Sequence, residues 1–369
     1  MKKFILILGL LLLVLVVITI LYIAHGKQLN EAYIKRLIKN AQKKFNIPAV
    51  AVNIMDSNQI LYSVYDGVRV TGTSDSITSE DYFHIGSTGK IILACIAANL
   101  VDENMINWDT KFFNLFPEMK KEAKEDYYDI TLEDLLSWRA GIQPYISGET
   151  EVFPELPKEG DQKLAFAKYL LQLEPFSKRD SSGKFEYLYS NASYSVACLM
   201  LEKVSDLTYE ELLDKYICKK LGVDIFIGWP YQKDRNQPWG HYSLDNKTLE
   251  IVGPDSDYAL HPVINAAGNL SMKSQDFAKF VQYYLKLMSG TNTGVSSKTV
   301  QYIHSKLLGS DTWHGKTYTC FDGSAGTFYA RGFLVPELDF ACTVIINSGN
   351  PDAVEYITTQ LVKAKNKTW

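Results

Sequence analysis

Apolar and polar residues follow first a helical and then a strand pattern near the start of the chain. Residues 30–45 carry apolar side chains at helical spacing among lysines, and the β-rich run 47–55 follows. Residues 56–58 read Asp-Ser-Asn, a turn signal, and 59–65 then returns as a strand. This part of the sequence therefore predicts a helix followed by a β-hairpin.

The middle of the chain, residues 82–290, is mainly helical in pattern, with long polar loops. Residues 191–204 and 271–287 are apolar stretches of helical length. Thr131 and Asp134 fit a capping box, in which each side chain accepts a hydrogen bond from the other residue's backbone N–H. We therefore expect a helix to begin at this pair.

The end of the chain returns to strand patterns. Residues 317–321, 327–334 and 340–346 alternate or run apolar between turn signals, and a closing helix is predicted over 353–365. Strands at both ends of the chain around a helical insertion favour one sheet built from both termini. The pattern thus indicates an α+β fold, an α/β sandwich with an all-helical region beside it.

The N-terminus has a pattern of its own. Lys2 and Lys3 precede an uncharged, almost wholly apolar stretch, residues 4–24, which is long enough to cross a bilayer core of about 30 Å. A lipoprotein signal would need a cysteine just after this stretch, but the first cysteine is Cys95, and residues 22–25 make a poor cleavage site. We therefore favour a retained anchor, residues 1–26, over a cleaved signal peptide. The positive-inside rule then places residues 27–369 outside the cell membrane as the extracytoplasmic part of a single-pass protein.

The net charge and the positions of the histidines and cysteines indicate which partners and cofactors are not expected. The formal net charge is -4 and no basic run follows the N-terminus, so nucleic acid is not expected as a partner. The six histidines are scattered, and the five cysteines lack paired metal-ligand spacing, so neither a metal nor another cofactor is expected. No disulfide is required, although Cys320 and Cys342 could face each other on neighbouring strands.

Candidate chemistry begins at Ser87-Thr88-Gly89-Lys90. Gly86 permits a tight turn, and an apolar stretch suited to a buried helix follows, so Ser87 is expected at a helix N-terminus. Lys90 would lie one turn later on the same face, within reach of the Ser87 hydroxyl. A lysine in a partly desolvated site can lose its proton near neutral pH and act as a base. The motif therefore indicates an activated serine.

The spacing alone is weak evidence, because it also occurs at Ser181-Ser182-Gly183-Lys184 in a polar stretch. A lone Ser-x-x-Lys is usually an ordinary helix start with a solvated lysine. Further motifs in order along the chain distinguish the first copy from the second. They are Ile47-Pro48-Ala49-Val50-Ala51-Val52, the run from Ile130 to Ile142, the run from Gly183 to Asn191, Ala267-Gly268-Asn269-Leu270-Ser271, the run from Gly323 to Phe328, and Ile345-Ile346-Asn347-Ser348-Gly349.

With these motifs, the chain resembles the serine penicillin-recognising enzymes, in the branch of class C β-lactamases, D-alanyl carboxypeptidases and related esterases. The resemblance runs from about residue 30 to residue 365. It implies a β-lactamase/transpeptidase-like fold with an antiparallel sheet from both termini, the sheet region at about 30–85 and 291–369 and the helical region at about 86–290.

The resemblance also assigns roles to residues. Tyr189-Ser190-Asn191 is the only Tyr-x-Asn in the chain, and in the family this tyrosine shuttles a proton to the leaving group. We expect its pKa to be lowered by the neighbouring cation of Lys90. Asn191 would hold Lys90 or the substrate's acyl amide. The oxyanion hole is expected at the backbone N–H groups of Ser87 and Ser324, the latter after Gly323.

The third family motif departs from the pattern. The family has Lys-Thr-Gly or His-x-Gly where this chain has Phe321-Asp322-Gly323. Phe321 offers no charge for a substrate carboxylate, and Asp322 would repel one if it faced the site. Asp322 could instead attract the ammonium group of a D-alanyl ester. Recognition of a free carboxylate is therefore doubtful in this sequence.

The sequence and the resemblance leave three hypotheses for the function of the protein. The first is a membrane-anchored serine hydrolase that cleaves D-alanyl esters of teichoic or lipoteichoic acid, with Ser87, Lys90 and Tyr189 as catalytic residues. The second is a D-alanyl-D-alanine carboxypeptidase or weak β-lactamase that binds carboxylate through another group, for example Arg331. The third is a non-catalytic cell-wall-binding receptor. The expected partners are a D-alanylated cell-envelope polymer, either teichoic acid or peptidoglycan, and the lipid bilayer.

Overall fold

The computed structural model describes residues 29–146, 152–243, 245, 248–291, 294–303, 311–313 and 315–366. Within them, the largest layer is an antiparallel sheet of six strands in the order β2-β1-β11-β10-β9-β8. These strands are β1 (Ala49–Met55), β2 (Ile60–Gly67), β8 (Asp311–Trp313), β9 (Lys316–Ser324), β10 (Tyr329–Val335) and β11 (Phe340–Ile346). Since β1 pairs with β11, the sheet combines both ends of the chain, as the strand pattern predicted.

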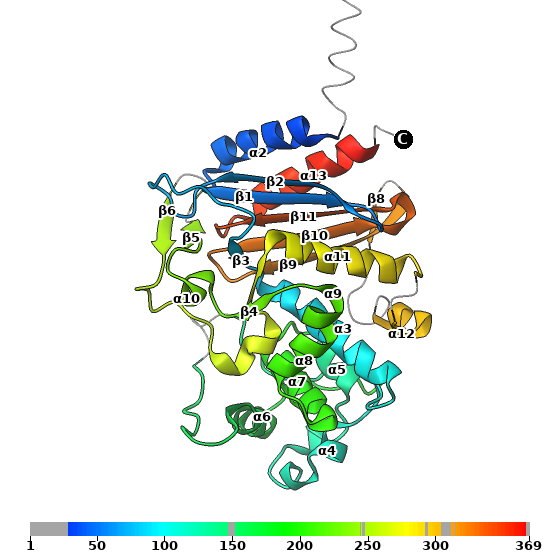
Figure 1. Ribbon diagram of the computed structural model, residues 1–369. Helices are drawn as coiled ribbons and strands as arrows, with labels where there is room; N and C mark the ends of the chain where they lie inside the picture. The colour runs from blue at the N-terminus through cyan, green and yellow to red at the C-terminus, as the bar shows by residue number, and fades with distance from the viewer. Residues whose placement is uncertain are drawn as a thin grey trace, which may run out of the picture.

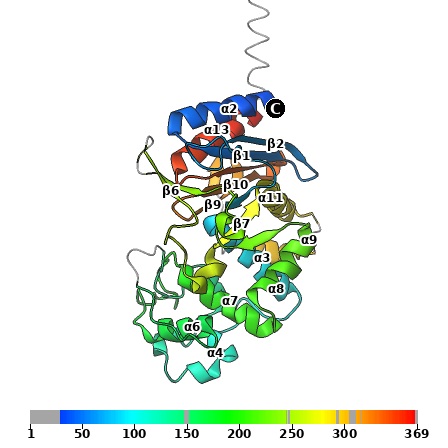
Figure 2. The ribbon, with the colours of Figure 1, turned by 60° about the vertical axis from the view of Figure 1, so that its left-hand side comes forward.

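Helices cover both faces of this sheet. On one face lie α2 (Glu31–Phe45) and α13 (Pro351–Asn366), and on the other lies α11 (Ser274–Met288) (Figure 1 and Figure 2). The apolar stripe of α2, which includes Ile34, Ile38 and Ala41, is fully buried, while its lysines face solvent. Since the sheet is covered on both sides, every residue of β1 and β11 is buried. The sandwich is therefore a rigid support for β9, which lies next to the edge strand β8.

A helical region lies below the sheet in Figure 1. Its two central helices, α3 (Gly89–Asp102) and α7 (Asn191–Ser205), are buried along most of their length. Around them are α4 (Phe112–Leu115), α5 (Leu132–Leu136), α6 (Gln162–Gln172), α8 (Tyr209–Leu213), α9 (Lys219–Leu221), α10 (Pro230–Lys233) and α12 (Ser297–Tyr302). The capping box of Thr131 and Asp134 is present at the start of α5, which confirms that prediction.

The structure also departs from the sequence pattern. The helix expected over 271–287 is preceded by a strand, β7 (Leu270–Lys273), which pairs with β3 (Tyr82–His84) and β4 (Ile225–Ile227) in a small second sheet. A further hairpin joins β5 (Gly240–Ser243) and β6 (Leu249–Val252). The helix that follows β7 is α11, which falls in the range expected for the helical region but packs on the sheet.

Two expectations concern cysteines and membranes. Cys320 and Cys342 do not face each other, because β10 separates their strands and Phe333 pairs with both residues. All five cysteines are free thiols. In the part of the chain that the structure describes, no helix combines the length and apolarity needed to span a bilayer. The predicted anchor, residues 4–24, lies outside the described residues.

Candidate active site

Ser87 lies in a tight turn between the small sheet and the helical region. The turn is the 3-10 helix η1 (Gly86–Thr88), which follows β3 and leads into α3, so Ser87 immediately precedes the helix instead of lying within it. Gly86 has φ +51, and a Cβ there would come within 2.4 Å of the backbone nitrogen of Ser324. Only glycine satisfies both conditions. The local sequence thus sets Ser87 directly against the end of β9.

Lys90 lies one helical turn after Ser87 and is 2% exposed. Its Nζ is 3.1 Å from Ser87 Oγ, 2.7 Å from Asn191 Oδ1 and 2.6 Å from the carbonyl oxygen of Ala267. No carboxylate neutralises it among the contacts of the described residues. Burial accordingly lowers the pKa of Lys90 well below the ordinary value for lysine.

The three contacts of Lys90 define what the neutral amine can do. A neutral amine has two N–H donors and one lone pair. The Ala267 carbonyl can only accept, and Asn191 Oδ1 also accepts, so these two take the N–H groups at the shorter distances. The lone pair then faces Ser87 Oγ, whose hydroxyl can donate. The geometry therefore lets Lys90 act as the general base for Ser87.

Tyr189 approaches Ser87 from the opposite side. Its hydroxyl donates to Ser87 Oγ at 2.7 Å, and its ring packs at a tilt of 33° against Trp138 with a centroid separation of 5.1 Å. Burial raises the pKa of Tyr189 to about 12, so the expectation of a lowered pKa is wrong. The physical reason is that a buried phenolate is penalised and a neutral Lys90 supplies no compensating charge. Tyr189 is therefore a neutral phenol that donates a proton.

Asn191 links the base to the helical region. It is the first residue of α7, where the side chain of Ser190 accepts a hydrogen bond from Ser193 N as an N-cap. While its Oδ1 accepts from Lys90, its Nδ2 donates to the carbonyl oxygen of Tyr145 at 2.8 Å. Asn191 thus holds Lys90, one of the two roles that the sequence suggested for it.

The predicted oxyanion segments meet at this turn. A Cβ added to Gly323 would lie 1.9 Å from the Ile85 carbonyl oxygen and 2.8 Å from Ser87 N, so β9 can approach the turn only with glycine here. Ser324 follows Gly323 and lines the same cleft as Ser87. The structure brings together the two backbone segments whose N–H groups were expected to bind an oxyanion.

The third-motif residues lie elsewhere. Arg331 Nε and Nη2 donate to the two carboxylate oxygens of Asp322 at 2.6 and 2.7 Å, and Glu355 of α13 also contacts this guanidinium. These residues lie on the α13 face of the sheet, away from Ser87. The expectation that Asp322 attracts a substrate ammonium is therefore wrong, and so is the alternative that Arg331 binds a carboxylate in the site.

Phe321 points to the other face of β9 but also avoids the cleft. It is buried, and its ring packs edge-on against Tyr284 of α11 at 5.8 Å. Side chains alternate along a strand, so Phe321 and Asp322 face opposite sides of the sheet. Each has a partner on its own side. Of the Phe-Asp-Gly segment, Gly323 is the residue that lies directly against the turn of Ser87.

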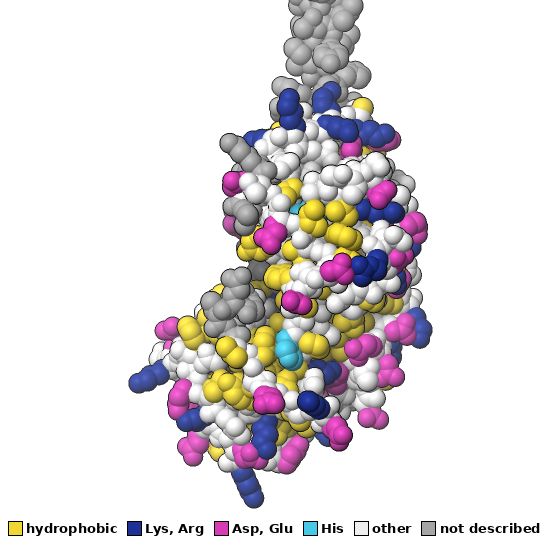
Figure 3. All heavy atoms as spheres, turned by 90° about the vertical axis from the view of Figure 1, so that its left-hand side faces the viewer, with side chains coloured by type: hydrophobic (Ala, Val, Ile, Leu, Met, Phe, Trp, Pro, Cys, Tyr) yellow, Lys and Arg dark blue, Asp and Glu magenta, His cyan; other side chains and the backbone are white. Residues whose placement is uncertain are grey.

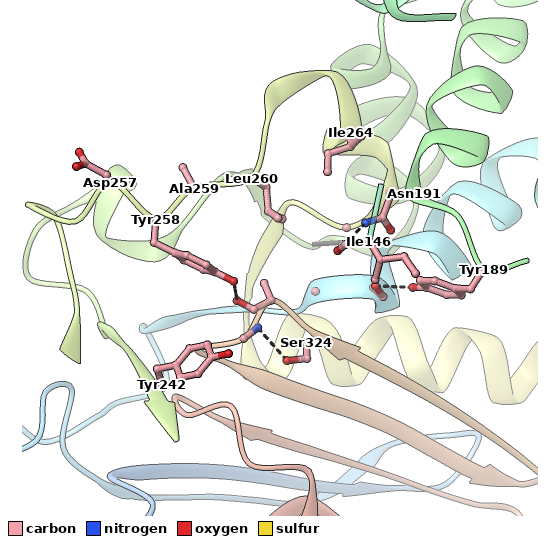
Figure 4. Close-up of a pocket in the computed structure, with 16 residues that line it drawn as sticks. Ile146, Tyr189, Asn191, Tyr242, Asp257, Tyr258, Ala259, Leu260, Ile264 and Ser324 are labelled. Atoms are coloured by element: carbon pink, nitrogen blue, oxygen red, sulfur yellow. Dashed lines mark hydrogen bonds between the residues drawn. The ribbon is translucent and has the colours of Figure 1, made fainter. Parts of the chain in front are cut away.

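A cleft of ≈ 490 Å³ opens beside Ser87 and is lined from both regions of the molecule. Figure 3 shows hydrophobic side chains gathered around a hollow on this side of the molecule. In Figure 4, Tyr189 and Asn191 lie at one end of the cleft, and Tyr242, Asp257 and Tyr258 at the other. Within the described part of the chain, Asp257 is the only charged side chain that lines it.

Sequence reasoning missed this far end of the cleft. Tyr258 donates a hydrogen bond to the carbonyl oxygen of Ala325 at 2.8 Å, which ties its loop to the segment after β9. Tyr242 and Tyr258 are 40% and 38% exposed, so part of each side chain faces the solvent. The sequence offers only a polar, turn-rich stretch at 253–258, and nothing in it places that loop near Ser87. No cluster of metal-binding side chains occurs among the residues that the structure describes.

Comparison with known proteins gives a family match. The family model described as Beta-lactamase matches residues 34–365. Among curated proteins, the chain is 22% identical over 361 residues to the unguisins hydrolase ungD' of Aspergillus campestris, covering 91% of this chain and 65% of that protein. It is 19% identical over 352 residues to Protein flp of Staphylococcus aureus, covering 91% and 67%. The chain thus spans about two thirds of the length of these relatives.

A solved structure shows the same fold. A class C β-lactamase from Rhodobacter sphaeroides superposes with a TM-score of 0.68 at 16% identity, covering 89% of this chain and 98% of that one. This confirms the β-lactamase/transpeptidase-like α+β fold with antiparallel sheets.

Proposed function

The chain belongs to the β-lactamase family of serine hydrolases, and we propose that it forms an acyl-enzyme on Ser87 to cleave D-alanyl esters on a cell-envelope polymer such as lipoteichoic acid. We further propose that residues 4–24 anchor it in the cell membrane with the catalytic domain outside. The observation that carries the substrate assignment is the charge of the cleft.

The acylation step uses the contacts around Ser87. Lys90 takes the hydroxyl proton while Ser87 Oγ attacks the ester carbonyl carbon, and the negative charge develops on the carbonyl oxygen beside Ser87 and Ser324. When the C–O bond breaks, Tyr189 gives its proton to the leaving alkoxide and recovers one from the Lys90 ammonium through the site. Lys90 then takes a proton from a water molecule that attacks the acyl carbon. The bond from this carbon to Ser87 Oγ breaks, Ser87 Oγ recovers the proton from Lys90, and the free acid leaves.

The charge of the cleft disfavours a carboxylate on the leaving group. Penicillins and D-Ala-D-Ala peptides carry one, and its recognition requires a cation. Among the described residues that line the cleft, none is Lys or Arg, and Arg331 is engaged by two carboxylates on the other face of the sheet. An ester whose leaving side is a neutral alcohol needs no such cation.

The far end of the cleft suits the polyol or sugar part of such a polymer. Tyr242 and Tyr258 are partly exposed aromatic side chains that line this end, and Ile146 adds an exposed apolar contact. Aromatic faces pack against the C–H surfaces of polyols and sugars, and their hydroxyl groups can bond such chains. The carboxylate of Asp257 at the outer rim favours a polymer that carries D-alanyl ammonium groups.

The test uses the full-length protein in detergent micelles with two substrates. One is D-alanylated lipoteichoic acid, the other a muropeptide that ends in D-Ala-D-Ala, and released D-alanine is measured for each. Ser87→Ala is the inactive control, and Ser181→Ala is the matched control in the other Ser-x-x-Lys. We expect release from the first substrate only, dependent on Ser87 and not on Ser181.

The other outcomes decide between the alternatives. Release from the muropeptide alone would make the protein a carboxypeptidase and refute the argument from the missing cation. Rapid acylation by low micromolar penicillin G would refute it in the same way. If neither substrate is cleaved and an organophosphonate does not label Ser87, the proposal of a hydrolase is wrong. The remaining hypothesis is then a non-catalytic cell-wall-binding receptor.

A further inference from the structure

A buried histidine lies directly behind the nucleophile, and the acyl transfer chemistry does not use it. His84 ends β3, is 0% exposed and lies three residues before Ser87. Its Nδ1 accepts a hydrogen bond from Gly86 N at 3.2 Å. The Gly86 N–H belongs to the turn that orients Ser87, so the imidazole is bonded to the backbone of the nucleophile turn.

The other ring nitrogen connects His84 to a different segment. Its Nε2 is 3.1 Å from Asn269 Oδ1. Since Nδ1 accepts from a backbone N–H, the ring proton is on Nε2 and is donated to the amide oxygen. Asn269 Nδ2 in turn donates to Asn265 Oδ1 at 2.9 Å. A chain of hydrogen bonds therefore runs from Gly86 through His84 and Asn269 to Asn265.

Asn265 is part of the segment that holds the base. It lies in the 3-10 helix η5 (Pro262–Ala267), whose last carbonyl, that of Ala267, accepts from Lys90 Nζ. The two segments also touch directly, because a Cβ on Gly268 would come within 2.4 Å of the Gly86 carbonyl oxygen. The chain thus connects the turn that carries Ser87 to the segment that anchors Lys90.

Packing keeps the imidazole in one orientation. Its ring stacks on Trp229 at a centroid distance of 4.3 Å and an interplanar angle of 19°, and Phe328 lies 6.4 Å away. Burial lowers the pKa of His84 to about 4, with the Asn269 hydrogen bond opposing the shift. No charged side chain of the described residues contacts the ring, so the neutral form with Nδ1 as acceptor persists at physiological pH.

We infer that His84, held by Asn269 and Asn265, is a positioning residue that fixes the register between Ser87 and Lys90 for acyl transfer. A mismatch of about 1 Å between reacting groups can cost on the order of 100-fold in rate. The inference rests on Ser87 acting as the nucleophile, but not on the identity of the acyl donor.

Three substitutions separate the two hydrogen bonds of the ring in the full-length protein. Asn Oδ1 occupies the place of Nδ1, so His84→Asn keeps the acceptor for Gly86 N. The Gln side-chain amide reaches the place of Nε2, so His84→Gln keeps the partner of Asn269. His84→Phe keeps the ring on Trp229 and loses both bonds. We expect the Phe variant to lose about 10- to 100-fold in kcat on p-nitrophenyl acetate with KM within about twofold, and the Asn variant to recover most of it.

Labelling of Ser87 by a fluorophosphonate, with the melting temperature measured in parallel, distinguishes the outcomes. If the unsubstituted protein is not labelled, the proposed function itself fails. If it is labelled and His84→Phe keeps its kcat, or if kcat follows the melting temperature equally in the Asn and Gln variants, His84 is structural only and the inference is overturned.

A further substitution tests the pH dependence of the rate, which would not change if His84 had only a structural role. Asn269→Asp places a carboxylate beside Nε2, which raises the pKa of His84 from about 4 towards the ordinary range near 6.5. Once protonated, Nδ1 carries a proton that opposes the Gly86 N–H. The pH–rate profile should therefore gain a second acid limb near pH 6, in addition to the rising limb that Lys90 gives to both proteins.

The matched control is Asn99→Asp in α3. Asn99 is 6% exposed and Asn269 is 7% exposed, and Asn99 accepts from Lys220 in place of a histidine. Its profile should keep the shape of the unsubstituted protein's profile. An Asn269→Asp profile with no new acid limb would overturn the positioning role even if the His84 variants fail to fold.

Discussion

The two Ser-x-x-Lys segments of this chain have the same spacing and opposite surroundings. Lys90 is buried in α3, and its Nζ hydrogen-bond partners among the described residues are neutral oxygen atoms, those of Ser87, Asn191 and the Ala267 carbonyl. Lys184 is 36% exposed, bonds the carboxylate of Asp134 and lies 3.9 Å from Glu133. Burial with no negative charge nearby favours an amine that has lost its proton, which is why the pKa of Lys90 is lowered.

The serines differ as much as the lysines. Ser87 lies in a turn packed against β9 and lines the cleft, while Ser181 is exposed in a loop. That loop is closed by Asp180, whose Oδ1 accepts from Ser182 N at 2.8 Å and from Lys184 N at 3.1 Å. The second segment is thus a local turn whose lysine stabilises α5. The comparison teaches that the burial and the neighbours of the lysine, not the spacing of the motif, distinguish a candidate base from a surface lysine.

The strongest test of the comparison exchanges the serines for alanine. Ser87→Ala should reduce ester hydrolysis by at least about 1,000-fold because it removes the nucleophile, and Ser181→Ala should leave it within about twofold. The kcat/KM for p-nitrophenyl acetate measures both. Equal losses in the two variants would contradict the assignment of Ser87.

Substitution of Lys90 should lower the activity, whereas substitution of Lys184 should lower the stability. Lys90→Met should lower kcat by about 100- to 10,000-fold, because the general base is lost. Lys184→Met should instead leave kcat nearly unchanged and lower the free energy of unfolding by about 1–3 kcal/mol, since the buried carboxylate of Asp134 loses its partner. Urea denaturation and steady-state kinetics on both variants check this. A large loss of kcat in the Lys184 variant would show that the second motif contributes to catalysis.

The pH–rate profile sharpens the description of the site. Activity requires neutral Lys90, whose pKa burial lowers, so the rate should rise with pH well below the ordinary lysine range and then level off. Neutral Tyr189 persists until about pH 12, so no alkaline fall is expected below about pH 11. In Tyr189→Phe the plateau should drop by about 100-fold while the rising limb stays in place. A limb that moves with this substitution would make the tyrosine the base.

The smallest effect is expected at the displaced third motif. Asp322→Asn should change kcat/KM on the D-alanyl ester by less than about twofold, because the side chain lies on the α13 face with Arg331. Hydrolysis of D-alanylated lipoteichoic acid by this variant is the measurement, with p-nitrophenyl acetate as the reference. A loss of activity confined to the D-alanyl substrate would show that Asp322 does contribute to recognition of this substrate.

Much of the fold follows from patterns that the sequence shows directly. The apolar stripe of α2, the capping box at α5 and the strand patterns at both ends are local signals, and the structure confirms each. The sequence pattern did not predict the short strands β3, β4 and β7. Each is three or four residues long, and its neighbours in the sheet are distant in sequence.

The candidate site divides in the same way. Ser87, Lys90, Tyr189 and Asn191 were identifiable because their residue types carry the chemistry and stand in recognisable motifs. The cleft's far end at Tyr242 and Tyr258 was not, because no local signal connects that loop to β9. The assignment of Asp322 failed because alternation along a strand says which residues share a face, but not which face meets the site.

The sequence alone determined the chemical groups of this protein: a serine after a glycine turn, a lysine one turn along an apolar helix, and a Tyr-x-Asn pair. Only the tertiary structure decided how these groups are charged and where substrate can lie. The acceptors of Lys90 stand 101 and 177 residues away, and Asp322 is bound by Arg331 of β10, whose guanidinium also contacts Glu355 of α13. Electrostatic environment depends on which distant atoms surround a group, and that is a property of packing, not of spacing along the chain.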